Sequence, residues 1–142
     1  MNAPRLLQIA HDDLAAMRAE IFAGFSASTA TIAPKYFYDA LGSRLFSAIT
    51  DLPEYYPTRT EAAIFSRYVN EMADALAPVA SLVDLGAGNC EKAARLFDPL
   101  QVQRYTAIDI SADYLRVSLE RLQREHPAMA LLGVGLDFSQ AL

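Results

Sequence analysis

The stretch that decides the fold is Ser81-Leu82-Val83-Asp84-Leu85-Gly86-Ala87-Gly88-Asn89-Cys90-Glu91-Lys92. Residues 82–85 predict a short buried strand, because they are mainly apolar and too few for a helix. Two glycines end this strand, and residues 92–97 continue with helical composition. A strand, a glycine turn and a helix are typical of the first half of a nucleotide-binding βαβ unit. Gly86 and Gly88 leave the backbone open to a ligand, and the free N–H groups of a helix N-terminus favour an anionic or polar one.

The glycine turn is not that of a dinucleotide-binding protein. It reads Gly-x-Gly-x-x-Glu, because Glu91 occupies the place of the third glycine of the dinucleotide fingerprint. This residue disfavours a dehydrogenase. The acid before the glycines, Asp84, instead resembles the first motif of Rossmann-type methyltransferases that use S-adenosylmethionine. The motif alone leaves two interpretations open, a ligand site and a turn that only serves tight packing.

Composition and charge exclude several classes of protein. The chain has 142 residues, enough for one domain, and its 53% hydrophobic and 20% charged residues are typical of a globular protein. A net charge of −5 without a lysine or arginine cluster argues against nucleic-acid binding. No apolar run or signal-peptide pattern predicts a membrane segment, and the single cysteine, Cys90, fits a cytoplasmic protein. Cys90 and the two histidines show no metal-ligand spacing, so we expect no metal site.

Residues 1–78 predict a helical N-terminal region. An apolar stripe at helical spacing predicts a first helix over residues 5–24, and a short second helix is expected over residues 43–50. Thr58 and Glu61 match a capping box at the start of a third helix. The side chains expected to face the core are Leu7, Ala10, Leu14, Met17 and Ile21 in the first helix, Leu45, Phe46 and Ile49 in the second, and Phe65, Tyr68, Val69, Met72 and Leu76 in the third.

The segment between the second and third helices carries two adjacent tyrosines between two prolines. Pro53 and Pro57 are expected to hold Glu54-Tyr55-Tyr56 in an extended, non-helical loop. Such a loop presents phenol rings at little entropic cost, which suits a contact to a ligand. The alternative is that the rings only cover the core, and we favour this interpretation for Tyr55.

Residues 79–142 predict the first half of a Rossmann-type domain. After the glycine turn, strands are expected over residues 105–110 and 130–136, separated by an amphipathic helix over residues 112–125. The sequence therefore predicts an α/β fold in which a helical region precedes three parallel strands joined by right-handed crossovers.

The carboxyl ends of these three strands are expected to meet at one edge of the sheet. Gly86, Asp109 and Asp137 follow the strands in turn, and ligands of open α/β sheets bind at this edge. Asp109 follows the glycine turn by about 20 residues, the distance typical of an acid that accepts hydrogen bonds from a ribose. Ser111 offers a cap for the following helix, so Asp109 is predicted to serve a ligand.

Taken together, the motifs resemble one family, the S-adenosylmethionine-dependent L-histidine Nα-methyltransferases of ergothioneine biosynthesis. The resemblance runs from about Leu6 to Phe138, and the proline–tyrosine loop is its most specific part. The matching pieces are Pro34-Lys35-Tyr36-Phe37-Tyr38-Asp39, Gly42-Ser43, Leu52-Pro53-Glu54-Tyr55-Tyr56-Pro57-Thr58-Arg59-Thr60-Glu61, Asp84-Leu85-Gly86-Ala87-Gly88, Glu91-Lys92 and Asp137-Phe138.

The resemblance implies roles at the matching positions. Tyr56 would contact the amino-acid substrate, with L-histidine expected. The residues implied to hold S-adenosylmethionine are Gly86, Gly88, Lys92, Asp109, Asp137 and Phe138. Among these, Lys92 would pair with the cofactor's carboxylate, and the last two would lie at its adenine. No residue is assigned as catalytic.

Family members are much longer than this chain, so we expect an amino-terminal portion without methyltransferase activity of its own. The strand at residues 82–85 would then leave its outer edge unpaired, and self-association through that edge is expected. Two alternatives stay open. One is a related N-methyltransferase for another amino acid, such as a tryptophan derivative; the other is a non-catalytic binding or interaction module.

Overall fold

The computed structural model describes residues 3–9 and 13–138, which form a parallel β-sheet with helices around it. In the described part of the chain the sheet has four strands in the order β1-β4-β3-β2. The strands are β1 (Arg5–Gln8), β2 (Leu82–Leu85), β3 (Arg104–Asp109) and β4 (Ala130–Gly135). The helices are α1 (Leu14–Phe25), the 3-10 helix η1 (Pro34–Phe37), α2 (Ala40–Thr50), α3 (Tyr56–Leu76), α4 (Glu91–Ala94) and α5 (Ala112–Glu125).

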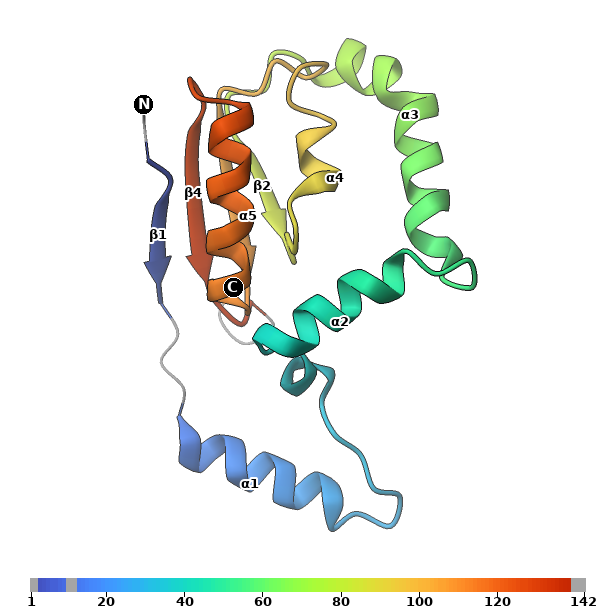
Figure 1. Cartoon of the computed structure of the whole chain (residues 1–142), viewed down its shortest axis with the longest axis vertical. Helices are drawn as coiled ribbons and strands as arrows, with labels where there is room; N and C mark the ends of the chain where they lie inside the picture. Colours follow the sequence, from blue (N-terminus) through green and yellow to red (C-terminus); the bar gives the residue numbers. More distant parts are fainter. Residues whose placement is uncertain (1–2, 10–12, 139–142) are drawn as a thin grey trace.

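The core lies between α5 and one face of the sheet (Figure 1). Side chains alternate along β3, so that Tyr105 and Ala107 are buried whereas Thr106 and Ile108 on the opposite face are half-buried. The fully buried side chains of largest volume are Tyr105, Phe97, Leu115, Leu119, Leu122 and Cys90. The expected α/β class with parallel strands is confirmed, and the arrangement is compatible with a partial Rossmann-like methyltransferase domain.

The pairing register of the strands places the predicted site residues at one edge of the sheet. Leu85 at the end of β2 pairs with Ile108, and Asp109 at the end of β3 pairs with Gly135. All strands run in parallel, so the glycine turn, Asp109 and the residues after β4 lie at the same edge of the sheet. The helix after the turn is shorter than predicted, because α4 ends at Ala94.

The prediction of one helix over residues 5–24 and of only three strands is wrong. Arg5–Gln8 forms β1, which pairs in parallel with β4 from Arg5↔Leu132 to Gln8↔Gly135. Leu7 therefore belongs to a strand, and Ala10 lies outside the described residues. Gly135 of β4 leaves room for the end of the Gln8 side chain, since a Cβ on Gly135 would meet Oε1 of Gln8.

The three N-terminal helices form, but their apolar faces are not buried as predicted. Helices α1, α2 and α3 extend around the end and the side of the sheet (Figure 1). The only fully buried side chain that the structure describes in them is Ser43. The large apolar side chains that remain exposed there include Leu14, Leu45, Phe46, Ile49, Tyr68 and Leu76. No helix among residues 3–9 and 13–138 is long and apolar enough to cross a membrane.

The start of α3 also differs from the prediction. The helix begins at Tyr56, with Tyr55 as its N-cap residue and Pro57 in the first turn, so no capping box forms at Thr58. Proline is well suited to this place, because its missing N–H would have no partner in the helix. The predicted extended loop is therefore wrong: residues 51–54 form a turn, in which the Tyr55 N–H donates to the carbonyl of Leu52 at 3.1 Å, and Tyr56 is helical.

Strand β2 is an edge of the sheet, because it pairs only with β3 among the described residues. Val83 and Leu85 project from the same face of β2 and are 56% and 46% exposed. The expected unpaired edge is therefore present, with an apolar face beside it. An edge of this kind is a template for pairing with another chain.

We predict that Val83→Lys reduces self-association of the chain, because it places a charge on the exposed apolar edge. Sedimentation velocity over a range of concentrations measures the effect. Leu14→Lys is the matched control, since Leu14 is 58% exposed on α1 and not on the edge strand. A parent chain that stays monomeric at all concentrations and unfolds cooperatively would contradict the prediction.

Candidate functional site

The glycine turn after β2 has a backbone that only glycine adopts readily. Gly86 and Gly88 have φ angles of 72° and 54°. The N–H groups of Gly86 and Ala87 donate to the carbonyl of Ile108 at 2.9 and 3.1 Å, which fixes the turn against the end of β3. A Cβ on Gly88 would meet nothing within 4 Å. The turn is thus rigidly held and open on its outer side.

Asp109 connects this turn to the helix that follows β3. Its Oδ2 accepts the N–H of Gly88 at 2.9 Å, and its Oδ1 accepts the N–H of Ser111 at 2.9 Å. A carboxylate has about four lone-pair positions, so each oxygen can still accept a further hydrogen bond. The structure therefore brings Asp109 and the glycine turn together, as the sequence predicted, and adds a structural task to Asp109.

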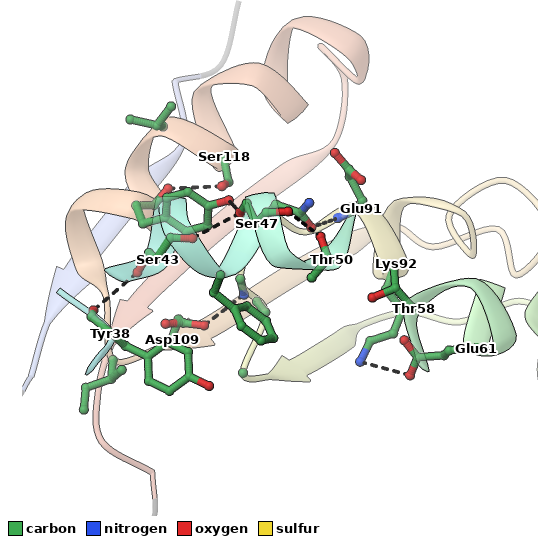
Figure 2. Close-up of a pocket in the computed structure, with 18 of the residues that line it drawn as sticks. Tyr38, Ser43, Ser47, Thr50, Thr58, Glu61, Glu91, Lys92, Asp109 and Ser118 are labelled. Atoms are coloured by element: carbon green, nitrogen blue, oxygen red, sulfur yellow. Dashed lines mark hydrogen bonds and ion pairs between the residues drawn. The ribbon is translucent and has the colours of Figure 1, made fainter. Parts of the chain in front are cut away.

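A cleft of about 1330 Å³ opens at this edge of the sheet. The glycine turn, the ends of β3 and β4, and α5 form its inner wall, and α2 and α3 form its outer wall (Figure 2). Of the residues predicted to hold a cofactor, those that line the cleft are Gly86, Gly88, Lys92, Asp109, Asp137 and Phe138. The cleft collects the whole predicted cofactor set from segments far apart in the sequence.

Lys92 reaches across the cleft toward α3. Its Nζ lies 3.7 Å from Oε1 of Glu61, and the side chains of Lys92 and Glu61 are 44% and 52% exposed. Figure 2 shows this ion pair between the two walls. An exposed pair of this length contributes little to stability, so Lys92 can exchange Glu61 for another carboxylate at low cost.

Asp137 and Phe138 close the cleft at the end of β4. The Phe138 ring lies against Gly86, since a Cβ there would be 3.8 Å from its Cζ. Lys35 of η1 lies 3.8 Å from Oδ2 of Asp137 and 2.8 Å from Oε2 of Glu20 on α1. The ion pair with Glu20 raises the pKa of Lys35, so the ammonium beside Asp137 stays protonated.

The loop tyrosines lie at the outer end of α2. Tyr56 is 67% exposed and does not line the cleft. Tyr55 is half-buried and packs edge-on against Phe46, a cleft residue, with ring centroids 5.8 Å apart. Arg59 of α3 holds the loop by donating to the carbonyls of Leu52 and Pro53. Neither tyrosine lines the cleft, but Tyr55 contacts Phe46, which does.

Sequence reasoning missed Arg121, which supports the glycine turn from α5. Its Nη1 donates to Oε1 of Glu91 at 3.0 Å, and its Nη2 donates to the carbonyl of Asn89 at 2.8 Å. A lone arginine on the polar face of an amphipathic helix gives no signal in one sequence. Only the fold shows that it reaches the turn.

Sequence reasoning also missed the buried polar network beneath the turn. The Tyr105 hydroxyl donates to Oδ2 of Asp84 at 3.0 Å, and Tyr105 and Cys90 are both 0% exposed. Burial raises the pKa of Cys90 to about 11, so its thiol stays protonated. Burial also raises the pKa of Asp84, and the hydrogen bond from Tyr105 opposes that shift only in part.

We predict that Asp84→Asn raises the melting temperature at neutral pH, because it removes a half-buried charge while keeping an acceptor for Tyr105. The folded-state pKa of Asp84 is raised above its ordinary value of 3.8. The parent chain therefore loses stability as pH rises from 3.8 through the raised pKa, and the advantage of the variant grows over the same range. Thermal unfolding from pH 3 to pH 8 tests this. Asp74→Asn, at an exposed position of α3, is the control. An advantage that does not change with pH would contradict the assignment.

Comparisons with known proteins agree with this geometry. The family model described as histidine-specific methyltransferase, SAM-dependent, matches residues 17–142. Histidine N-alpha-methyltransferases of Mycobacterium tuberculosis and Mycolicibacterium smegmatis are 37% and 40% identical to this chain over 131 residues, covering 89% of it and 40% of each relative. The 4-dimethylallyltryptophan N-methyltransferase of Claviceps purpurea is 32% identical over 107 residues, covering 72% of this chain and 31% of the relative.

The chain spans about two fifths of the length of the mycobacterial relatives. Within that span the similarity is nearly continuous, and the family model covers the cleft and every predicted site residue. The chain belongs to the SAM-dependent, histidine-specific methyltransferase family.

Proposed function

We propose that the protein methylates the α-amino group of L-histidine with S-adenosylmethionine, as a step of ergothioneine biosynthesis. The observation that carries the proposal is the open glycine turn, which Asp109 bridges at the carboxyl edge of the sheet. The names of the mycobacterial relatives support histidine as the substrate, and a relative named ergothioneine biosynthesis protein 1, from Neurospora crassa, is 34% identical over 89 residues.

The residues of the cleft fit S-adenosylmethionine. Open space above Gly88 lets an uncharged part of a ligand approach the backbone, where a side chain would be in the way. Asp109 offers acceptors for vicinal hydroxyls, and Lys92 offers an ammonium for a carboxylate. Phe138 supplies an apolar ring beside Gly86 for an aromatic base.

Methyl transfer depends mainly on how the cofactor and the amine are positioned relative to each other. Bound S-adenosylmethionine supplies an electrophilic methyl group, and a neutral amine must attack it in line. In this chain, Asp109 and Lys92 would orient the cofactor from two sides of the cleft. The α-amino group must also lose its ammonium proton, and we assign no residue of this chain to that step.

The chain covers about two fifths of the mycobacterial relatives, so the proposed activity is that of a protein of their length. We propose that residues 79–142, together with β1, carry the first half of the cofactor domain and that the rest of residues 1–78 carry the wall facing the amino acid. The 142 residues alone are expected to show no methylation. The proposal also places the protein in the cytoplasm, without nucleic-acid or membrane partners, on the charge and composition described above.

A related N-methyltransferase for a tryptophan-like amino acid is the second candidate. Its support is the Claviceps purpurea relative, whose name gives a dimethylallyltryptophan as its substrate. The lower identity and coverage make it the weaker proposal. Competition between histidine and tryptophan for methylation in the full-length protein separates the two.

We predict that Asp109→Ala in the full-length protein weakens binding of S-adenosylmethionine by about 1–3 kcal/mol, because charge-assisted hydrogen bonds to the carboxylate are lost. Isothermal titration calorimetry measures the change. The matched control is Asp113→Ala, since Asp113 lies on the first turn of α5 with its side chain 83% exposed. Tight binding of NAD together with no binding of S-adenosylmethionine would overturn the proposal.

The tyrosine that contacts the substrate is tested by a pair of variants. The family resemblance implies Tyr56, whereas the packing of Tyr55 on Phe46 favours its neighbour. We predict that Tyr55→Phe in the full-length protein raises KM for histidine with little change in melting temperature, and that Tyr56→Phe has the smaller effect. A larger rise in KM for Tyr56→Phe would restore the assignment from the resemblance. A fall in melting temperature without a change in KM for either variant would make both tyrosines structural.

A further inference from the structure

A continuous series of hydrogen bonds connects α2 to the glycine turn. Ser43 Oγ on α2 shares its proton between Ser111 Oγ at 3.1 Å and the carbonyl oxygen of Tyr38 at 3.3 Å. The Ser111 N–H donates to Oδ1 of Asp109 at 2.9 Å. The other oxygen of Asp109 accepts the N–H of Gly88 at 2.9 Å. Figure 2 shows Ser43 and Asp109 at the same end of the cleft. The outer wall is therefore linked to the turn by three hydrogen bonds, which are joined through the covalent bonds of Ser111 and Asp109.

The contact between the two serines is buried. Ser43 and Ser111 are 5% and 8% exposed, so water does not readily replace the hydrogen bond between their hydroxyls. Gly42 permits this depth, because a Cβ there would lie 1.7 Å from the carbonyl oxygen of Phe37. The close approach of α2 to η1 thus explains Gly42, and the hydrogen bond to Ser111 explains the hydroxyl of Ser43.

Ser111 is unusual for the residue that begins a helix. It is the N-cap residue of α5, yet its side chain makes no capping hydrogen bond. A serine at this position ordinarily accepts an N–H of the first helical turn. Here its hydroxyl is bonded to Ser43, and its N–H donates to Asp109. Without Ser43, the Ser111 hydroxyl is free to accept an N–H of its own helix. The conformation of Ser111 would then change, and Ser111 is the residue whose N–H donates to Asp109.

We propose that Ser43 is a positioning residue for the cofactor turn, acting through Ser111 on Asp109 and Gly88. This inference deepens the proposed function, since it rests on Asp109 as the acid that binds the cofactor. Its role is to couple the helical wall of the cleft to the group that receives the cofactor, so that displacement of α2 loosens the turn.

Ser47 provides a matched control. It lies one turn after Ser43 on the same helix, and its hydroxyl is 2.6 Å from the hydroxyl of Tyr114 on α5. Ser47→Ala therefore removes the hydrogen bond to Tyr114 and the bond that the Ser47 hydroxyl donates to the Ser43 carbonyl at 3.1 Å, but it leaves the side chains of Ser43, Ser111 and Asp109 in place. A merely structural role of the contact between α2 and α5 would affect both serine variants alike.

The test compares Ser43→Ala, Ser111→Ala and Ser47→Ala in the full-length protein. Hydrogen exchange at the Gly88 amide measures how firmly the turn is held, and calorimetry measures binding of S-adenosylmethionine. Ser111→Ala keeps the backbone N–H that donates to Asp109 and removes only the hydroxyl, so it serves if Ser43→Ala does not fold. We expect faster exchange at Gly88 and a Kd raised roughly two- to tenfold for the first two variants, and neither effect for Ser47→Ala.

Equal effects of Ser43→Ala and Ser47→Ala on the Gly88 amide would overturn the proposal. Unchanged exchange in both Ser43→Ala and Ser111→Ala would overturn it as well. If the full-length parent protein binds no S-adenosylmethionine while Gly88 exchange still responds to the first two variants only, the proposed function fails and the positioning role of Ser43 stands.

Discussion

The carboxylate of Asp109 holds the site together. It accepts one N–H from the glycine turn and one from the start of α5, so it fixes three segments that meet at the end of β3. Gly88 has a positive φ, and the local sequence alone does not fix the direction in which its N–H points. The same carboxylate keeps lone pairs for a ligand, so in the proposed function the shape of the turn and cofactor binding would depend on one side chain.

The buried side chains beneath the glycine turn explain why the turn tolerates a strained backbone. Cys90 has a φ of 62°, a conformation that costs free energy for a residue other than glycine. Its side chain is fully buried beside Tyr105, and the Cys90 N–H donates to the carbonyl of Ala87 at 2.8 Å. Tyr105 in turn anchors Asp84, which retains a raised pKa in this setting. Packing and hydrogen bonds around Cys90 offset the strain and hold the turn in one shape.

How much of the fold the sequence predicts depends on where each signal lies. Strands β2, β3 and β4 and helix α5 were predicted within about a residue at each end, because apolar runs and the stripe of Leu115, Leu119 and Leu122 are local signals. Strand β1 was missed because its partner lies more than a hundred residues away in the sequence. The meeting of Gly86, Asp109 and Asp137 at one edge of the sheet was predicted because parallel strands bring their carboxyl ends together, whereas Lys92 and Phe138 were expected only from the family resemblance. The contacts of Ser43, Ser111 and Arg121 around the turn were not predicted, because serine and arginine occur on most helices and give no signal in one sequence.

The helical stripes of α2 and α3 predicted which faces are apolar but not what covers them. Leu45 and Leu76 remain exposed, and the contacts that hold the outer wall in the described part of the chain are largely polar. These include the serine contacts to α5, the Arg59 bonds to the loop carbonyls and the Lys92–Glu61 pair. Hydrogen bonds and exposed ion pairs are directional but individually weak. The position of α2 therefore depends mainly on a small number of replaceable polar contacts, whereas α3 also packs Met72 and Ala73 against the core and the inner wall is fixed by the apolar core under α5.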